Sequence, residues 1–235
     1  METIEEWWDD CHRAKQDRLS PVSKLSCTYF VSDFGGPELW NSLNIANRIS
    51  SNVSVLEIGV GGGNDIRELH ARGVRVHALD ITPAALDKVQ AFTEGRWLES
   101  DIQLLSERFF DIAISHLVTQ HISNETLSRQ IRHVLRALKA NGVFAMQFAD
   151  RITGVDKESY SESLDCQREG GVCRSLSMME EVVTAAGGKI TWLSQPRDFP
   201  QGARWFNIHI RDKSFGWRGK LSDHYRTATR HWRKG

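Results

Sequence analysis

Residues 53–64 read VSVLEIGVGGGN, and this stretch decides the fold. It begins as an apolar, β-branched run and ends in a cluster of glycines, and Ile66, Leu69 and Ala71 follow at helical spacing. This order predicts a buried strand, a tight turn and the N-terminus of a helix. Glycines in such a turn allow positive φ angles and close approach of a ligand to the backbone. The amides that open the helix favour a negative group such as a carboxylate or phosphate.

The spacing of the glycines narrows the choice of ligand. Glu57, Gly59, Gly61 and Gly63 fit the pattern acidic-x-Gly-x-Gly-x-Gly, whereas the dinucleotide pattern Gly-x-Gly-x-x-Gly is not met, because Asn64 occupies its third glycine position. With this pattern the chain resembles the class I S-adenosylmethionine-dependent methyltransferases. In that family the loop wraps the methionine end of the cofactor. The loop taken alone also fits an ordinary strand-to-helix turn.

Composition limits the class of protein and its partners. The chain has 235 residues, a length that suits one domain with additions, and 40% of them are hydrophobic, which is enough for a core. The formal net charge is zero, so we expect neither a nucleic-acid partner nor attraction to acidic membranes. No apolar run reaches transmembrane length, and the acidic start is wrong for a secretory signal. The four cysteines are scattered without a CxxC pair, which favours free thiols and a cytoplasmic location.

Strand and helix patterns alternate along the chain, which predicts an α/β fold with a doubly wound, mostly parallel sheet and right-handed crossovers. We expect strands at 53–57, 74–80, 97–102, 110–115, 143–148, 189–193 and 205–210, and helices at 2–19, 37–49, 65–73, 83–92, 124–138 and 178–186. The last two strands can pair as a hairpin. The resemblance implies seven strands with an antiparallel last strand, a Rossmann-like methyltransferase fold. The expected domains are an N-terminal helical cap (1–50), a cofactor-binding core (51–212, with an insertion at 150–174) and a basic C-terminal tail (213–235).

Acidic residues fall where the first three strands end, and ligands of parallel sheets bind at that edge. Asp80 follows the first glycine by about twenty residues, the spacing at which a carboxylate takes ribose hydroxyls; a solvated strand-end charge is the alternative. The resemblance implies that Glu57 faces the methionine ammonium, although it can equally brace the loop by accepting from backbone amides. It also implies that Asp101 accepts from the adenine amine while the Ile102 amide bonds a ring nitrogen; a simple turn residue is the alternative for Asp101. By the same resemblance, Ile81 and Ser115 border the cofactor.

Two histidines, His116 and His121, follow the fourth strand. A hydroxyl acceptor must lose its proton during methyl transfer, and imidazole titrates near neutrality, so either ring suits a general base or a site-lining role. Capping of the next helix, or packing against adenine, fits His121 as well. The Asn/Asp-Pro-Pro-Tyr sequence of nucleobase and glutamine methyltransferases is absent, which argues against planar amide and exocyclic amine acceptors. No cysteine pair or His/Glu cluster has metal-ligand spacing, so we predict no metal site.

Acceptor recognition is expected from aromatic residues outside the sheet: Trp8, Tyr29, Trp40 and Tyr160. The C-terminal tail interleaves basic and aromatic residues, so it can hold an anionic acceptor such as a phosphate- or nucleotide-linked sugar. A solvated terminal helix explains the tail equally well. The sequence carries no signal for an oligomeric state.

The resulting hypothesis is an S-adenosylmethionine-dependent enzyme that methylates a hydroxyl of a small molecule or glycan precursor. A cofactor-binding scaffold that regulates a partner is the alternative from another class, and an intact glycine loop with Asp80 argues against lost cofactor binding. An NAD-dependent oxidoreductase is the third interpretation. Asn64 in the third glycine position and the additional carboxylate of Asp101 disfavour it.

Overall fold

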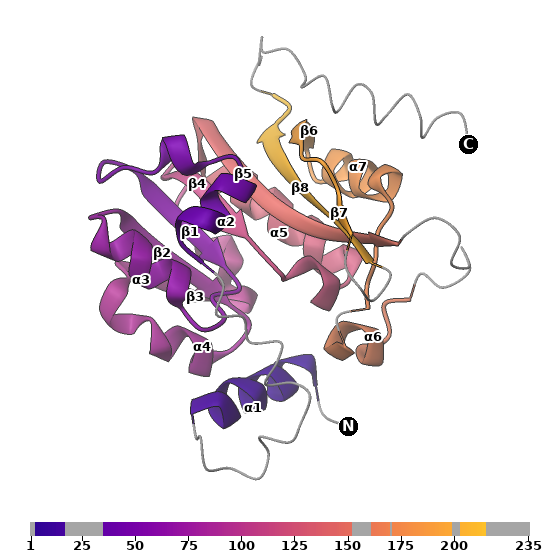
Figure 1. Ribbon diagram of the computed structural model, residues 1–235, viewed down its shortest axis with the longest axis horizontal. Helices are drawn as coiled ribbons and strands as arrows, with labels where there is room; N and C mark the ends of the chain where they lie inside the picture. The colour runs from indigo at the N-terminus through magenta and orange to yellow at the C-terminus, as the bar shows by residue number, and fades with distance from the viewer. Residues whose placement is uncertain (1–2, 17–34, 152–160, 170, 199–202, 215–235) are drawn as a thin grey trace.

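The structure is a computed structural model, and it describes residues 3–16, 35–151, 161–169, 171–198 and 203–214. One mixed sheet forms its centre, with the strand order β3-β2-β1-β4-β5-β8-β6, and the two-residue β7 pairs with β8 (Figure 1). The strands are β1 Ser54–Ile58, β2 Arg75–Asp80, β3 Gly95–Leu98, β4 Phe110–Ser115, β5 Leu138–Arg151, β6 Gly188–Leu193, β7 Arg197–Asp198 and β8 Ala203–Asp212.

The first five strands run parallel, while β8 is antiparallel to both β5 and β6. The predicted α/β class, the mostly parallel sheet and the antiparallel terminal pair are therefore confirmed. The burial of β1 on both faces explains its unbroken apolar pattern, since a parallel strand covered on both sides has no solvent-facing residues.

Helices cover both faces of the sheet, and each face has its own apolar cluster. One cluster packs α5 (Asn124–Ala137) and α7 (Leu176–Ala185) against the sheet. The other packs α2 (Pro37–Ser42), α3 (Asn64–Ala71) and α4 (Pro83–Lys88) against the opposite face (Figure 1). The N-terminal helix α1 (Ile4–Gln16) lies outside these layers, where it contacts α4 and α6 (Leu164–Glu169). Short 3₁₀ turns complete the described elements: η3 Ala46–Arg48, η4 Gln90–Phe92, η5 Glu99–Leu104 and η6 Thr119–His121.

Several predicted boundaries are wrong. The strand expected at 97–102 ends at Leu98, and the 3₁₀ turn η5 follows, because the chain leaves the sheet where Glu99 pairs with Arg129 of α5. The helix expected at 37–49 breaks after Ser42, since Asn44 adopts φ 54° between α2 and η3. Side chains of β8 bond the carbonyl groups where α2 ends. Asn207 donates to the Ser42 carbonyl at 2.9 Å, and His209 Nε2 lies 2.7 Å from the Leu43 carbonyl oxygen.

Three smaller points concern the start of α5, the length of β5 and the segments that the sequence analysis set apart from the core. Ser123, not Asn124, is the N-cap of α5, and its hydroxyl accepts from the Thr126 amide. Strand β5 extends beyond the predicted 143–148 at both ends, because residues 144–151 pair with β8 and Leu138 pairs with Phe110 of β4. The proposed insertion at 150–174 contains α6, while most of the basic tail lies outside the described residues. No helix among the described residues is long and apolar enough to cross a membrane.

Candidate cofactor and acceptor site

A pocket opens at the carboxyl ends of β1, β2 and β4, the edge at which parallel sheets bind ligands. Its volume is about 720 Å³ when the space at its open mouth is counted. The described residues that line it are Trp8, His12, Ile58, Gly59, Gly61, Leu79, Asp80, Ile81, Glu99, His116, Leu117, Val118, His121, Ile122, Thr126 and Gln130. Most of this surface is apolar, and its titratable side chains are two carboxylates, Asp80 and Glu99, and three imidazoles, His12, His116 and His121.

The glycine loop forms one wall of the pocket. Gly59, Gly61 and Gly63 have φ angles of 75°, 53° and 75°, in the region that side-chain-bearing residues avoid. The Gly59 amide donates to the Leu79 carbonyl at 2.8 Å, so the loop passes directly over the end of β2. A Cβ atom at Gly59 would lie 2.3 Å from Cγ2 of Val118, so any side chain at this position would require Val118 or the loop to shift. Gly63 is the N-cap of α3 and does not line the pocket.

Asp80 ends β2 beneath this loop. Its Oδ2 accepts from the Val60 amide at 2.8 Å and its Oδ1 from the Thr82 amide at 3.1 Å. Burial raises its pKa to about 6, against the opposing effect of these backbone amides. A carboxylate offers about four acceptor positions, so two amide bonds leave capacity for ribose hydroxyls. The position of Asp80 and its remaining acceptor capacity therefore fit a ribose.

Glu57 does not line the pocket but lies against Asp65 of α3. Asp65 accepts from the Gly36 amide at 2.7 Å and from the Trp40 indole at 2.6 Å. Burial, reinforced by the neighbouring Asp65 carboxylate, raises the pKa of Glu57 well above its usual range, and burial raises the pKa of Asp65 to about 6. Oε2 of Glu57 and Oδ2 of Asp65 are buried without a hydrogen-bond partner among the described residues. The printed bonds of Asp65 go to Gly36 and Trp40 and not to the glycine loop, so both the bracing role of Glu57 and its contact with the methionine ammonium stay predictions.

At the end of β3 the structure brings Glu99 into the pocket, while Asp101 and Ile102 lie in η5 outside its lining. Glu99 is paired through Oε2 with Arg129, and its Oε1 is buried without a partner among the described residues. Burial raises the pKa of Glu99, and the Arg129 charge opposes this shift. Sequence reasoning missed Glu99 because it placed the strand end too late; its position directly after the apolar pair Trp97-Leu98 was the available signal.

His121, in η6, has a defined tautomer. Its Nδ1 lies 2.7 Å from the Gln167 carbonyl oxygen, and a carbonyl can only accept, so Nδ1 carries the proton and Nε2 carries the lone pair. The ring packs edge-on against Trp8 with centroids 4.8 Å apart. Burial lowers the pKa of His121 to about 4, partly opposed by the bond to Gln167, and burial lowers the pKa of His116 to about 4. Both rings are therefore neutral at pH 7.

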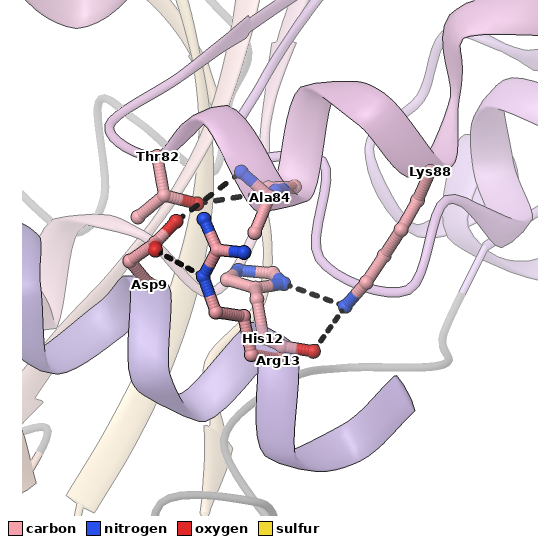
Figure 2. Close-up of polar contacts among 7 residues, drawn as sticks. Asp9, His12, Arg13, Thr82, Ala84 and Lys88 are labelled. Carbon is pink, nitrogen blue, oxygen red and sulfur yellow. Dashed lines mark hydrogen bonds and ion pairs between the residues drawn. The ribbon is translucent and has the colours of Figure 1, made fainter. Parts of the chain in front are cut away.

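The N-terminal helix α1 forms part of the pocket wall, to which it contributes Trp8 and His12. Two contacts hold this helix to α4: Asp9 accepts from the Ala84 amide at 3.2 Å, and the Lys88 ammonium lies 3.1 Å from His12 Nδ1 and 2.9 Å from the His12 carbonyl (Figure 2). Sequence reasoning predicted Trp8 but missed His12. Its place one helical turn after Trp8 on the same face was the signal that could have found it.

Of the remaining predicted site residues, some line the pocket and others do not. Ile81 lines the pocket, whereas Ser115 is buried beside it and does not. Trp40 is 1% exposed and outside the lining, because its indole serves Asp65. Tyr29 and Tyr160 lie outside the described residues. Within the described part of the chain, no three His, Cys, Asp or Glu side chains gather in a way that could hold a metal ion.

Comparisons with known proteins agree with this geometry. Residues 56–146 match the family model described as a methyltransferase domain. The ubiquinone biosynthesis O-methyltransferase of Rickettsia akari is 26% identical over 111 residues, which are 45% of this chain and 43% of that protein. The match thus spans less than half of that relative's length.

Solved structures share the fold at low identity. Magnesium protoporphyrin IX methyltransferase from Synechocystis PCC 6803, determined with bound S-adenosylhomocysteine, superposes with a TM-score of 0.58 at 14% identity, covering 89% of this chain and 98% of that one. The [4+2]-cyclase SpnF superposes with a TM-score of 0.53 at 12% identity, covering 72% and 79%. The fold alone therefore hosts more than one reaction. Residues 56–146 therefore match a methyltransferase domain, and the glycine loop and the strand order with its antiparallel last strands resemble those of the class I S-adenosylmethionine-dependent methyltransferases.

Proposed function

We propose that this protein transfers a methyl group from S-adenosylmethionine to a hydroxyl of a small molecule. The observation that carries the proposal is His121: a neutral imidazole whose Nε2 lone pair is set by the Gln167 carbonyl, in the same pocket as the glycine loop and Asp80. A pocket with cofactor determinants on one side and a base on the other suits transfer to a group that must lose a proton.

The cofactor would be held by residues that the structure brings together. Backbone of Gly59 and Gly61 would face its amino-acid half, Asp80 would accept from the ribose, and Glu99 would serve the adenine side in place of Asp101. When bound, the cofactor supplies an electrophilic methyl on a sulfonium. The protein then has to align donor and acceptor, and proximity can contribute on the order of 7–11 kcal/mol.

His121 would take the hydroxyl proton at Nε2 as the oxygen attacks. Its lowered pKa keeps the ring unprotonated at neutral pH, so the accepting form is fully populated. The same low pKa makes it a modest base, which suits an acceptor whose hydroxyl is itself acidic, such as a phenol, better than a sugar hydroxyl. Lysine and arginine are absent from the described lining of the pocket, so an anionic acceptor would depend on the tail, outside the described residues.

The test pairs two substitutions at one position. In His121→Asn the amide can still donate to the Gln167 carbonyl, as Nδ1 does, but nothing replaces Nε2. In His121→Gln the amide reaches toward the position of Nε2 and the Nδ1 bond is lost. Methyl transfer from tritiated S-adenosylmethionine to the hydroxylated metabolites of the source cell should fall by about 10²–10⁴-fold in His121→Asn, with affinity for S-adenosylhomocysteine retained.

Unchanged transfer by His121→Asn would remove the base assignment. Tight cofactor binding by the wild type without transfer to any hydroxylated fraction would favour the alternative function, a scaffold that uses the cofactor as a structural ligand. Calorimetry with NAD supplies the control for the oxidoreductase interpretation, for which preferential NAD binding would be required.

A further inference from the structure

The segment between β4 and α5 supplies much of the pocket wall and carries backbone strain. Five of the described lining residues come from it: His116, Leu117, Val118, His121 and Ile122. Leu117 has φ 58°, in the left-handed region that bulky side chains avoid, and among the described non-glycine residues with positive φ it alone lines the pocket. Such a conformation persists only where the surrounding structure holds the chain in place.

The strained segment lies against the glycine loop. A Cβ atom built at Gly59 would lie 2.3 Å from Cγ2 of Val118, the residue after Leu117. Val118 is also the N-cap of η6, and the His121 amide donates back to its carbonyl at 2.8 Å. A shift of this segment would therefore change the pocket wall and the support of the glycine loop together.

The guanidinium of Arg174 bonds this segment from outside the pocket lining. Arg174 is 1% exposed, and it does not line the pocket. Its Nη1 donates to the Thr119 carbonyl and its Nη2 to the Ile122 carbonyl, each at 2.6 Å. Its Nε donates to Asn124 Oδ1, also at 2.6 Å. Because Thr119 begins η6, Ile122 caps its end and Asn124 begins α5, these charge-assisted bonds span the whole junction between the two elements.

Arg174 is itself anchored to the sheet. Its amide donates to the Ala149 carbonyl of β5 at 2.7 Å, and the next residue, Ser175, is the N-cap of α7. Two residues earlier, the Val172 amide donates to the Gln120 carbonyl at 3.3 Å. A guanidinium presents its donors in a planar fork, which an ammonium cannot reproduce. The strained segment is thus tied to β5 and to the start of α7.

We propose that Arg174 is a positioning residue of the reaction site. It holds residues 117–122 in the strained conformation that places Val118 against Gly59. Without the guanidinium fork, Leu117 relaxes and the wall shifts, which weakens cofactor binding and misaligns the methyl group with its acceptor. For this second effect the inference rests on the proposed function, which it deepens.

Hydrogen exchange of the full chain tests the local role. Arg174→Lys keeps the charge and loses the fork, and Val183→Ala, in the core outside the pocket, is a destabilised control. Exchange of the β1 amides reports global unfolding. At pH 7 without denaturant, residues 117–122 should exchange faster in Arg174→Lys by about tenfold or more beyond any change in β1. In Val183→Ala the segment should change only as β1 does, and the same result in Arg174→Lys would overturn the proposal.

A matched pair of substitutions tests the strain at Leu117. Leu117→Gly and Leu117→Ala both remove the side chain, but only glycine adopts positive φ without a penalty. In the Arg174→Lys background, Leu117→Gly should restore slow exchange at residues 118–122, whereas Leu117→Ala should not. Equal exchange in the two double variants would overturn the claim that Arg174 holds Leu117 in its strained conformation.

Calorimetry and the tritium assay supply the functional readouts. The dissociation constant of S-adenosylhomocysteine should rise by about fivefold or more in Arg174→Lys and stay unchanged in Val183→Ala. With the hydroxyl acceptor found by the tritium assay, kcat should fall by about tenfold or more, and KM for the acceptor should change less. Unchanged affinity and kcat in Arg174→Lys would overturn the positioning role. If the wild type methylates no hydroxyl, the proposed function fails on its own, and hydrogen exchange with cofactor affinity still decides the role of Arg174.

Discussion

The substitution Gly59→Ala tests the glycine loop most sharply, because two separate penalties meet at this residue. Gly59 has φ +75°, and an alanine in the left-handed region costs about 1–2 kcal/mol. The added Cβ would also lie 2.3 Å from Cγ2 of Val118, an overlap that core insertions relieve at a cost of about 1–3 kcal/mol. We therefore expect the free energy of unfolding to fall by about 2–5 kcal/mol.

Two controls separate these penalties. Gly187 has φ +90°, and no atom lies within 4 Å of the place that a Cβ would take there, so Gly187→Ala should show the backbone penalty alone. Val118→Ala removes Cγ2 and leaves only the Val118 Cβ, 3.6 Å from the new methyl, which is an ordinary contact. The double variant Gly59→Ala/Val118→Ala should thus be more stable than the sum of the single effects by about 1–3 kcal/mol.

Urea unfolding of the wild type, the three single variants and the double variant gives each change in the free energy of unfolding, provided that the m-value is constant. Calorimetry with S-adenosylhomocysteine adds a second readout, since the displaced loop should bind the cofactor weakly in Gly59→Ala and better in the double variant. If Gly59→Ala costs no more than Gly187→Ala, or if the double variant is simply additive, the close approach of the loop to Val118 is refuted.

Three further outcomes are expected. Asp80→Asn should weaken S-adenosylhomocysteine binding at least tenfold, about 1.4 kcal/mol, whereas Asp87→Asn, at an exposed position of α4, should leave it unchanged in calorimetry. Burial lowers the pKa of His209 to about 4, so its contribution to the free energy of unfolding is present above pH 6.5 and is lost as pH falls toward 4. Asp80 has the opposite pH dependence, because burial raises its pKa to about 6. Its contribution is full below pH 3.8 and is lost as pH rises through 6. Asp80→Asn should therefore lose more stability between about pH 6.5 and 4.5 than the wild type does in urea unfolding. Arg174→Met should lower the free energy of unfolding in urea by about 3 kcal/mol or more, and Arg174→Lys should be destabilised as well. The reason is that the buried guanidinium donates to the Asn124 side chain and to the carbonyls of residues 119 and 122, at 2.6 Å each.

The sequence predicts those features that depend on neighbouring residues. The apolar run of β1, the glycines with positive φ and the Thr82-Pro83 helix start are local signals, and the structure has each of them, with the Thr82 hydroxyl accepting from the Ala85 amide. Asp80 reaches the pocket because it is the last residue of β2. Local propensity and spacing suffice for these elements because no distant contact competes with them.

The features that sequence reasoning missed depend on distant contacts. Glu99 leaves the sheet to meet Arg129, thirty residues later in the chain. Arg174 holds the η6 segment from a position some fifty residues beyond it. The Lys88 ammonium lies 3.1 Å from His12 Nδ1, although the two residues are 76 positions apart in the chain. No periodicity or motif encodes such pairs, since either partner is an ordinary surface-type residue until the fold brings them together.

The segment from Asp80 to Lys88 connects the carboxyl end of β2 with the contacts that hold α1. At its start, Asp80 accepts from the Thr82 amide and faces the cofactor side of the pocket. One turn later, the Ala84 amide at the N-terminus of α4 donates to Asp9, where the helix dipole favours a carboxylate. At its end, the Lys88 ammonium donates to the His12 carbonyl at 2.9 Å. Because Asp80 directly precedes α4 and α1 is bonded to α4 through Asp9 and Lys88, this short segment sets the separation between Asp80 and α1. A misplacement of about 1 Å between donor and acceptor can cost on the order of 10²-fold in rate. Substitutions that loosen α1 from α4, such as Asp9→Ala, should therefore lower kcat far more than they lower cofactor affinity.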